Sequence, residues 1–260
     1  MSREPASYTK HGWLLKTKKV ILRKLVHSIA GFGEQSLGAI EFYLRPSVRT
    51  SWGGPFNGQH ARRFLIDEIL SVIRFAAIIE TGTFRGTTTE YLHKSSGLPV
   101  YTVELKRRYY GYAKARFAFN SAVRVYYEDS RRFLRRIAED AEYLKKQNVL
   151  FYLDAHWGGD PPLKEELQVI FGKFDNAVVM IDDFKVPHDG EYAYDVYGKG
   201  AALTLEYLSP LTTITGFSAF FPKCKAAQET GLRRGCVVLA RAHHLVDQLK
   251  EVKTLLLNAE

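Results

Sequence analysis

Cysteine is scarce in this chain of 260 residues, which contains only Cys224 and Cys236. Two cysteines cannot build a disulfide framework, and these two form neither a Cys-x-x-Cys pair nor the Cys/His spacing of a zinc finger. The chain also lacks a run of about 18 apolar residues, so we expect no membrane-spanning helix. No secretory signal is visible either, and we therefore expect a cytoplasmic protein.

Acidic residues are outnumbered, since 28 Asp and Glu face 37 Lys and Arg and leave a formal net charge of +9. The excess is concentrated in residues 1–50, with nine basic and three acidic side chains, and in residues 106–146, with twelve and five. A basic surface favours a phosphorylated substrate, nucleic acid or an anionic membrane, or it is simply a solvated face. A hydrophobic content of 46% excludes a mainly disordered chain.

The N-terminal region differs from the rest of the chain. Apolar residues recur at helical spacing between residues 20 and 30, at Leu22, Leu25, Val26 and Ile29. We expect this helix to cap the domain, and a weak contact with an anionic membrane surface is the alternative. Turn-forming residues follow at 50–59. We therefore predict a basic, amphipathic segment with its loop over residues 1–58 and one domain over residues 59–260.

Apolar runs alternate with helical patterns through most of the chain. Expected strands cover residues 76–80, 100–104, 123–127, 149–153 and 177–181, and expected helices cover 60–74, 86–94, 107–119, 131–146, 162–171 and 200–207. Two further strands, 213–221 and 235–241, and a helix over 243–257 complete the pattern. This alternation predicts an α/β fold with a doubly wound, mostly parallel sheet, and the last two strands indicate an antiparallel edge.

Five of the apolar runs end in acidic residues. These are Glu80, Glu104, Asp129, Asp154, and Asp182 with Asp183. In open α/β sheets ligands bind outside the carboxyl ends of the strands. A single acid at such a place is ordinary polar surface, but five in order on one edge predict a ligand site.

The first of these strand ends opens a turn that contains Gly82 and Gly86 and leads into a helix. Glycines let the backbone approach a ligand, and the helix start offers free amide hydrogens. The turn lacks the second close glycine of a dinucleotide-binding pattern. Glu104 follows Gly82 by 22 residues, where a carboxylate can accept both hydroxyls of a ribose. Asp129 and Ser130 could hold an adenine amino group, although Ser130 could equally be a helix cap.

Five segments carry a resemblance to a known family: Glu80-x-Gly82-x-x-x-Gly86, Glu104, Asp129-Ser130, Leu153-Asp154-Ala155-His156-Trp157 and Ile181-Asp182-Asp183. Over residues 60–241 the chain resembles class I S-adenosylmethionine-dependent methyltransferases, and most closely the metal-dependent macrocin-type O-methyltransferases. The glycine turn and Glu104 are generic to the class. The acids of the fourth and fifth strands are more specific.

The resemblance implies a seven-stranded sheet with the last strand inserted antiparallel. It also implies S-adenosylmethionine over the glycine turn, with its ribose on Glu104 and its adenine near Asp129. The residues implied at the cofactor are Glu80, Thr81, Gly82, Gly86, Thr87, Glu104, Asp129, Ser130 and Asp154. A divalent ion, usually magnesium, is implied between Asp154, Asp182 and Asp183.

The chemistry of methyl transfer to a hydroxyl gives these residues roles. Carboxylate oxygens suit magnesium, which lowers the pKa of a bound oxygen, although one of Asp182 and Asp183 could instead cap the next loop. His156 lies two residues after Asp154, and its ordinary pKa suits a general base. A metal ligand and a structural histidine bonded to the backbone are the alternatives. The resemblance implies an acid or a lysine as the base near this position, and His156 departs from that pattern. The catalytic candidates are therefore His156 and Asp154.

The sequence thus predicts a magnesium-assisted, S-adenosylmethionine-dependent O-methyltransferase that acts on a small hydroxylated acceptor, such as a sugar or another natural-product-like molecule. A cephalosporin hydroxylase-like enzyme of the same fold would share the binding residues. The basic charge keeps an RNA methyltransferase open, and an NAD oxidoreductase would need the missing glycine. The alternative that is not an enzyme is a membrane-associated or partner-binding module.

Overall fold

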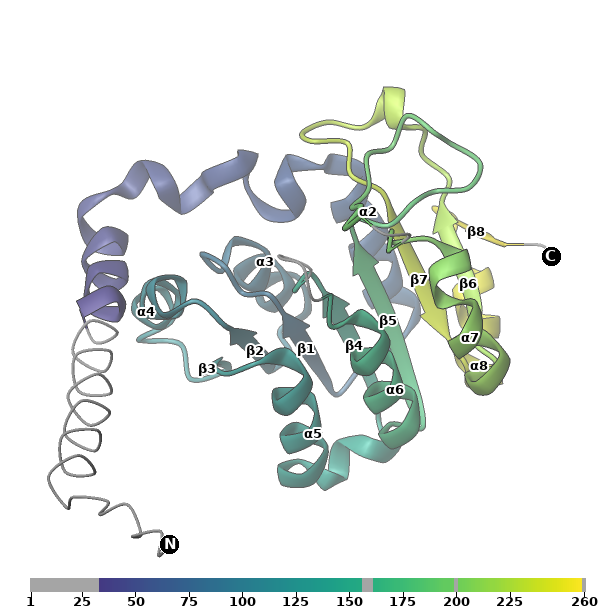
Figure 1. Ribbon diagram of the computed structural model, residues 1–260, viewed down its shortest axis with the longest axis horizontal. Coiled ribbons are helices and arrows are strands. Elements are labelled where there is room, and N and C mark those ends of the chain that lie inside the picture. Colours follow the sequence, from purple (N-terminus) through teal and green to yellow (C-terminus); the bar gives the residue numbers. More distant parts are fainter. Residues whose placement is uncertain (1–32, 156–160, 199–200, 259–260) are drawn as a thin grey trace, which may run out of the picture.

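The computed structural model describes residues 33–155, 161–198 and 201–258, and a mixed β-sheet forms its centre (Figure 1). The eight strands of these residues are ordered β3-β2-β1-β4-β5-β7-β6-β8. Their bounds are β1 Ala77–Thr81, β2 Val100–Glu104, β3 Val123–Tyr127, β4 Asn148–Leu153, β5 Asn176–Asp182, β6 Ser218–Pro222, β7 Cys236–Ala240 and β8 Leu255–Leu257. Strands β1 to β5 run parallel, whereas β7 pairs antiparallel with both β5 and β6. The predicted α/β fold and its inserted antiparallel strand are confirmed.

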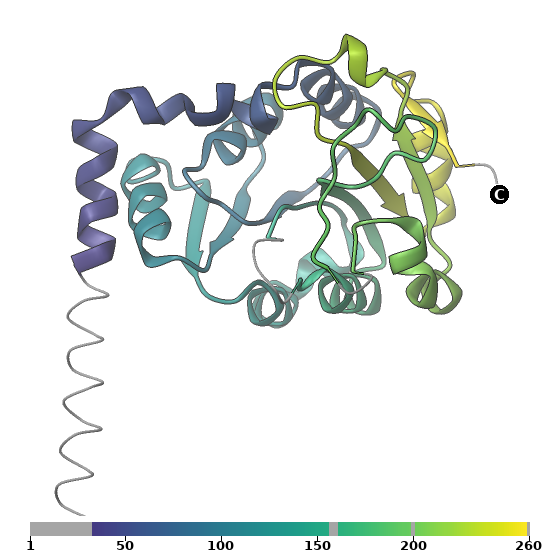
Figure 2. The same cartoon turned by 45° about the horizontal axis from the view of Figure 1, so that its top comes forward.

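Helices cover both faces of the sheet, as a parallel sheet of buried strands requires (Figure 2). The α-helices with defined bounds are α2 His60–Val72, α3 Thr87–Ser96, α4 Arg107–Arg116, α5 Ser130–Asp140, α6 Leu163–Lys173, α7 Leu205–Thr215 and α8 His243–Lys250. Helices α5, α6 and α7 pack on one face, and α2, α3, α4 and α8 pack on the other. In β4, Phe151 and Leu153 face the first layer, while Leu150 and Tyr152 face the second.

The sheet has one strand more than the seven that we predicted, and the predicted helix over 243–257 is wrong in its last part. Helix α8 ends at Lys250, and Leu255–Leu257 pairs antiparallel with β6. The cause is Glu68 on α2, whose carboxylate accepts the amide hydrogens of Lys253 and Thr254, both at 2.9 Å. These two hydrogen bonds hold the chain in a turn and direct it back to the sheet edge.

Helix α7 lies later in the chain than the predicted helix over 200–207. The Thr204 hydroxyl accepts the amide hydrogen of Tyr207 at 3.2 Å and caps the helix start, and Gly216 ends the helix in a left-handed conformation. The predicted strand over 213–221 therefore begins only at Ser218. Helix α5 also stops before the predicted residue 146, and the 3₁₀-helix η3 (Glu142–Lys146) continues the chain.

The chain that precedes α2 wraps around one end of the sheet (Figure 2). Residues 33–44 are helical, and the 3₁₀-helices η1 (Pro46–Gly53) and η2 (Pro55–Gly58) lead from them to α2. The helix predicted over residues 20–30 lies outside the described residues. Among the described residues, no helix is both long and apolar enough to cross a bilayer. The division of the chain after residue 58 stays a prediction.

Candidate active site

The strand register brings the predicted site residues to one edge of the sheet. Thr81 is level with Val103 in β2 and with Leu153 in β4, and Leu153 is level with Ile181 in β5. The residues that follow these positions therefore begin their loops side by side. The carboxyl edge thus gathers the glycine turn, Glu104 and the acids of β4 and β5.

The glycine turn lies directly against the end of β4. Gly82 has a φ of 89°, and a Cβ atom built on it would lie 2.3 Å from the backbone oxygen of Asp154. Gly86 has a φ of 72°, and a Cβ atom there would lie 2.6 Å from the ring of Phe117. Helix α3 begins behind the turn at Thr87 and has no side-chain cap. Its first amide hydrogens are thus available to a ligand.

Glu104 joins the turn to β2. Its carboxylate accepts the amide hydrogen of Phe84 at 2.8 Å and that of Lys106 at 2.7 Å, one on each oxygen. Burial raises the pKa of Glu104, although these two amide donors oppose the rise. Each carboxylate oxygen still has a lone pair for a further donor, so the two hydroxyls of a ribose can be accepted here.

Glu80 lies beneath the turn and is only 1% exposed. One of its oxygens accepts the hydroxyl hydrogens of Thr89 and Thr102, both at 2.5 Å. Burial, only partly offset by these hydrogen bonds, raises the pKa of Glu80 to about 7. The structure thus makes Glu80 a brace between β1, β2 and α3, and not an open ligand at the cleft.

Asp129 caps α5 and is tied to its neighbour. Its carboxylate accepts the amide hydrogen of Arg131 at 3.0 Å and pairs with the Arg131 guanidinium at 2.9 Å. These bonds hold the pKa of Asp129 below its usual range. Ser130 is buried in the first turn of the same helix. The cap that we predicted for Ser130 is therefore supplied by Asp129.

Sequence reasoning missed Glu166, a fully buried carboxyl group in the first turn of α6. No described residue forms a hydrogen bond with either of its oxygens, and the buried hydroxyl of Thr81 also lacks a partner among the described residues. Burial raises the pKa of Glu166 to about 7, although the nearby hydroxyls of Ser130 and Thr81 moderate the rise. The sequence did contain a signal, because Glu166 lies on the apolar face of α6 together with Leu163 and Ile170.

Asp182 at the end of β5 is part of a buried ion pair. Arg62 of α2 donates to one carboxylate oxygen at 2.5 Å, and the Tyr152 hydroxyl donates to the other at 2.6 Å. The side chains of Arg62 and Asp182 are 2% and 1% exposed. Although burial acts to raise the pKa of Asp182, the Arg62 charge and the hydrogen bonds outweigh it and lower the pKa.

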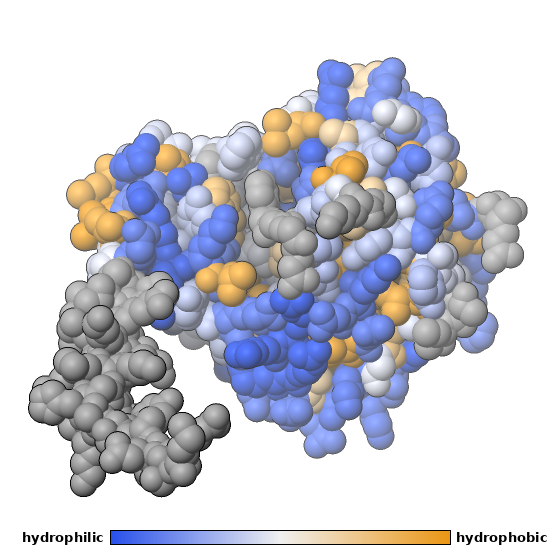
Figure 3. All heavy atoms as spheres, viewed as in Figure 1, coloured by the Kyte–Doolittle hydropathy of each residue, from blue (hydrophilic) through white to orange (hydrophobic). Residues whose placement is uncertain are grey.

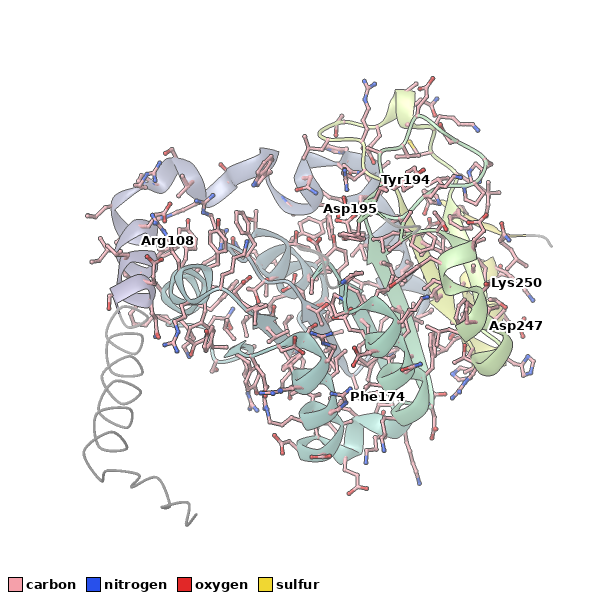
Figure 4. The ribbon with its side chains drawn as sticks, viewed as in Figure 1. Arg108, Phe174, Tyr194, Asp195, Asp247 and Lys250 are labelled. Atoms are coloured by element: carbon pink, nitrogen blue, oxygen red, sulfur yellow. The ribbon has the colours of Figure 1, made fainter. Side chains whose placement is uncertain are left out.

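Asp183 is paired in the same way with a second arginine. It has a φ of 56°, and its carboxylate accepts Nε–H of Arg234 at 2.6 Å. Burial and the adjacent Asp182 raise the pKa of Asp183 to about 7, against the opposing charge of Arg234. Arg234 also pairs with Asp195, which accepts the Tyr197 hydroxyl at 3.0 Å. Figure 4 shows Asp195 on the loop above the end of β5.

The described residues do not support the metal site that we predicted from Asp154, Asp182 and Asp183. Two arginine side chains already pair with Asp182 and Asp183, and no three His, Cys, Asp or Glu side chains of the described residues could hold a metal ion together. Of these three acids, only Asp154 has no described hydrogen-bond or ion-pair partner for its carboxylate. Burial and the charges of Asp182 and Asp183 raise its pKa well above the usual range. His156, the predicted base, and Trp157 lie outside the described residues.

A cavity of about 590 Å³ lies along α2, and none of the predicted site residues lines it. Its walls include Phe64, Tyr192, Cys224 and Lys253. The predicted site residues therefore lie at the carboxyl edge of the sheet and not in this cavity. At that edge the glycine turn and the carboxylates come together.

No protein-family model matches the chain, and no curated protein sequence matches it. Solved structures do match. An O-methyltransferase from Bacillus cereus in complex with S-adenosylhomocysteine has 16% identity and a TM-score of 0.53, over 79% of this chain and 90% of that one. A methyltransferase from Podospora anserina with S-adenosylhomocysteine bound has 10% identity and a TM-score of 0.52, over 93% and 99%. The chain therefore has the Rossmann-like methyltransferase fold.

Proposed function

We propose that this protein is an S-adenosylmethionine-dependent O-methyltransferase that acts on a hydroxyl group of a small acceptor. The observation that carries the proposal is the turn at Gly82, which faces the carboxylate of Glu104 across the carboxyl edge. The left-handed glycine leaves no room for a side chain, and the carboxylate keeps acceptor capacity for a ribose. The shared fold of two methyltransferases with S-adenosylhomocysteine bound supports the choice of cofactor.

Residues of this chain have distinct roles in the proposal. Gly82 and Gly86 leave the backbone open to the cofactor, Glu104 accepts its ribose hydroxyls, and Asp129 with Ser130 borders its adenine. S-adenosylmethionine, when bound, supplies an activated methyl group, so the protein mainly has to align the acceptor. The acceptor hydroxyl must also lose a proton, and Asp154 can take it when its carboxyl group is ionised. His156 remains the second candidate for this base.

Magnesium has no role in the proposed function. The described acids do not fit the ion, because Arg62 and Arg234 supply positive charge to Asp182 and Asp183. A hydroxylase-like enzyme of the same fold and an RNA methyltransferase remain alternatives to the small-molecule methyltransferase. The substrate that the protein acts on distinguishes the three functions.

Calorimetry with S-adenosylhomocysteine tests the cofactor. We expect saturable binding with one site per chain and no binding of NAD under the same conditions. The variant Glu104→Ala should lose most of the affinity while its circular dichroism spectrum stays that of the wild type. A folded wild-type protein that gives no heat with S-adenosylhomocysteine would contradict the proposal.

A further inference from the structure

The helix over residues 33–44 is fixed to α4 through contact between the two backbones. A Cβ atom on Gly38 would lie 1.9 Å from the backbone oxygen of Arg108, and one on Gly111 would lie 2.0 Å from that of Gln35. Glycine on each helix thus removes the side chains that would keep the helices apart. Because the contact is this close, the outward face of the helix has a defined direction.

A buried carboxylate strengthens the same attachment and leaves positive charge beside it. Glu41 is 5% exposed and pairs with Arg45, Arg85 and Arg108 at 3.2, 3.1 and 3.0 Å. One negative charge therefore faces three positive charges. The side chains of Arg45 and Arg108 are 59% and 46% exposed, so this excess positive charge reaches solvent. Figure 4 labels Arg108 beside this helix.

The outward face of this helix is mainly apolar, and the exposed Glu34 lies one turn before it. Leu37, Ile40 and Leu44 follow one another at intervals of three and four residues and therefore share one face, which Tyr43 adjoins. Their exposed fractions are 49%, 50% and 74%, and that of Tyr43 is 55%. Figure 3 shows apolar atoms over this helix beside hydrophilic ones. We call Leu37, Ile40, Tyr43 and Leu44 the apolar stripe.

We propose that the apolar stripe docks on an anionic lipid surface. A helix that lies on a membrane sinks its apolar face only about 5–10 Å into the headgroup region, and basic residues beside it add electrostatic attraction. The stripe provides the apolar face, and Arg45 and Arg108 provide the charge. The stripe contains none of the residues proposed to bind the cofactor, so this proposal does not depend on the proposed function.

A second copy of the chain fits the stripe less well. Two copies that met here would bring their exposed Arg45 and Arg108 side chains together, and like charges repel. Four side chains also cover far less than the roughly 800 Å² per partner of a standard interface. An anionic bilayer has neither difficulty, because it attracts the arginines and needs no complementary shape.

Vesicle co-sedimentation of the full chain tests the proposal. The vesicles are phosphatidylcholine alone, or equal parts of phosphatidylcholine and phosphatidylglycerol. We expect binding to the anionic vesicles only, and weaker binding as salt is added. The double variant Ile40→Glu with Leu44→Glu should bind at least about tenfold more weakly. The matched control is Leu232→Glu with Leu257→Glu, two leucines that are 46% exposed elsewhere, and it should bind like the wild type.

Three outcomes would overturn the proposal. The wild type could fail to bind anionic vesicles, or the stripe variant could bind as well as the wild type. Light scattering could instead reveal a dimer that the stripe variant dissociates, which would make a second copy the occupant. Both variants alter exposed side chains, so a melting temperature close to that of the wild type should show that they are folded.

Discussion

Gly82 packs so closely against Asp154 that a Cβ atom on the glycine would lie 2.3 Å from the aspartate's backbone oxygen. The substitution Gly82→Ala should therefore lower stability by about 2–4 kcal/mol, because strain at a φ of 89° adds to the collision. It should also abolish S-adenosylhomocysteine binding, since the turn must move. Urea unfolding and calorimetry measure the two effects.

The control for this variant is Gly97→Ala at the end of α3. Gly97 has a similar φ of 70°, but nothing lies within 4 Å of a Cβ atom built there. Its substitution should cost only about 1 kcal/mol and leave ligand affinity unchanged. Equal effects of the two substitutions would show that the contact with Asp154 has no importance.

The ribose contact is tested by the substitution Glu104→Gln. An amide group cannot accept on both ends, so one amide hydrogen of the turn or one ribose hydroxyl would lose its acceptor. We expect the affinity for S-adenosylhomocysteine to fall at least about tenfold, the equivalent of about 1.4 kcal/mol. Glu128→Gln, at the end of the neighbouring strand, alters only a partly exposed pair with Arg136 and should leave the affinity unchanged. An unchanged affinity for Glu104→Gln would place the ribose elsewhere.

Local patterns in the sequence were sufficient to predict the five parallel strands and their acidic ends. Glu104 and Asp154 lie where the carboxyl-edge rule places them, since a strand end is determined by a few neighbouring residues. The partners of the β5 acids could not be predicted in this way. Arg62 lies 120 residues before Asp182, and Arg234 lies 51 residues after Asp183. No short-range pattern in the sequence indicates such a pair.

Strand β8 illustrates the same limit for the fold. Its three residues belong to a segment with helical spacing, so the predicted helix continued through them. The chain turns instead because Glu68, 185 residues before Lys253, accepts backbone amide hydrogens there. A distant side chain thus overrides a weak local preference for helix.

The Arg62–Asp182 pair predicts a specific pattern of stabilities. Arg62→Met leaves a buried carboxylate without its cation and should cost about 3–5 kcal/mol. Adding Asp182→Asn removes the isolated charge, so the double variant should be more stable than Arg62→Met alone. Urea unfolding of both single variants and the double variant measures this coupling. A double variant that loses the sum of the two single effects would show that the residues do not interact.

The pairs Arg62–Asp182 and Arg234–Asp183 together predict that divalent ions have no effect on the folded protein. Because Arg62 and Arg234 already pair with Asp182 and Asp183, magnesium and manganese should leave the melting temperature and the affinity for S-adenosylhomocysteine unchanged. Treatment with EDTA should likewise have no effect. A manganese-dependent rise in melting temperature that the Asp183→Asn variant abolishes would restore a metal site at this edge.

Glu166 should make stability depend on pH in a direction opposite to that of a paired carboxylate. Its pKa is about 7 in the folded protein, above the ordinary value of 4.5, so the folded state retains a proton that the unfolded state releases. Its contribution to stability is fully present below pH 4.5 and is lost as the pH rises through about 7, by up to about 3 kcal/mol in total.

Glu166→Gln cannot ionise and should lose this dependence. The variant should therefore gain stability relative to the wild type between pH 5 and about 7.5 in urea unfolding. Glu165→Gln, on the exposed side of the same helical turn, should follow the wild-type curve throughout. If Glu166→Gln and Glu165→Gln show the same pH dependence, then the buried carboxyl group is not the cause.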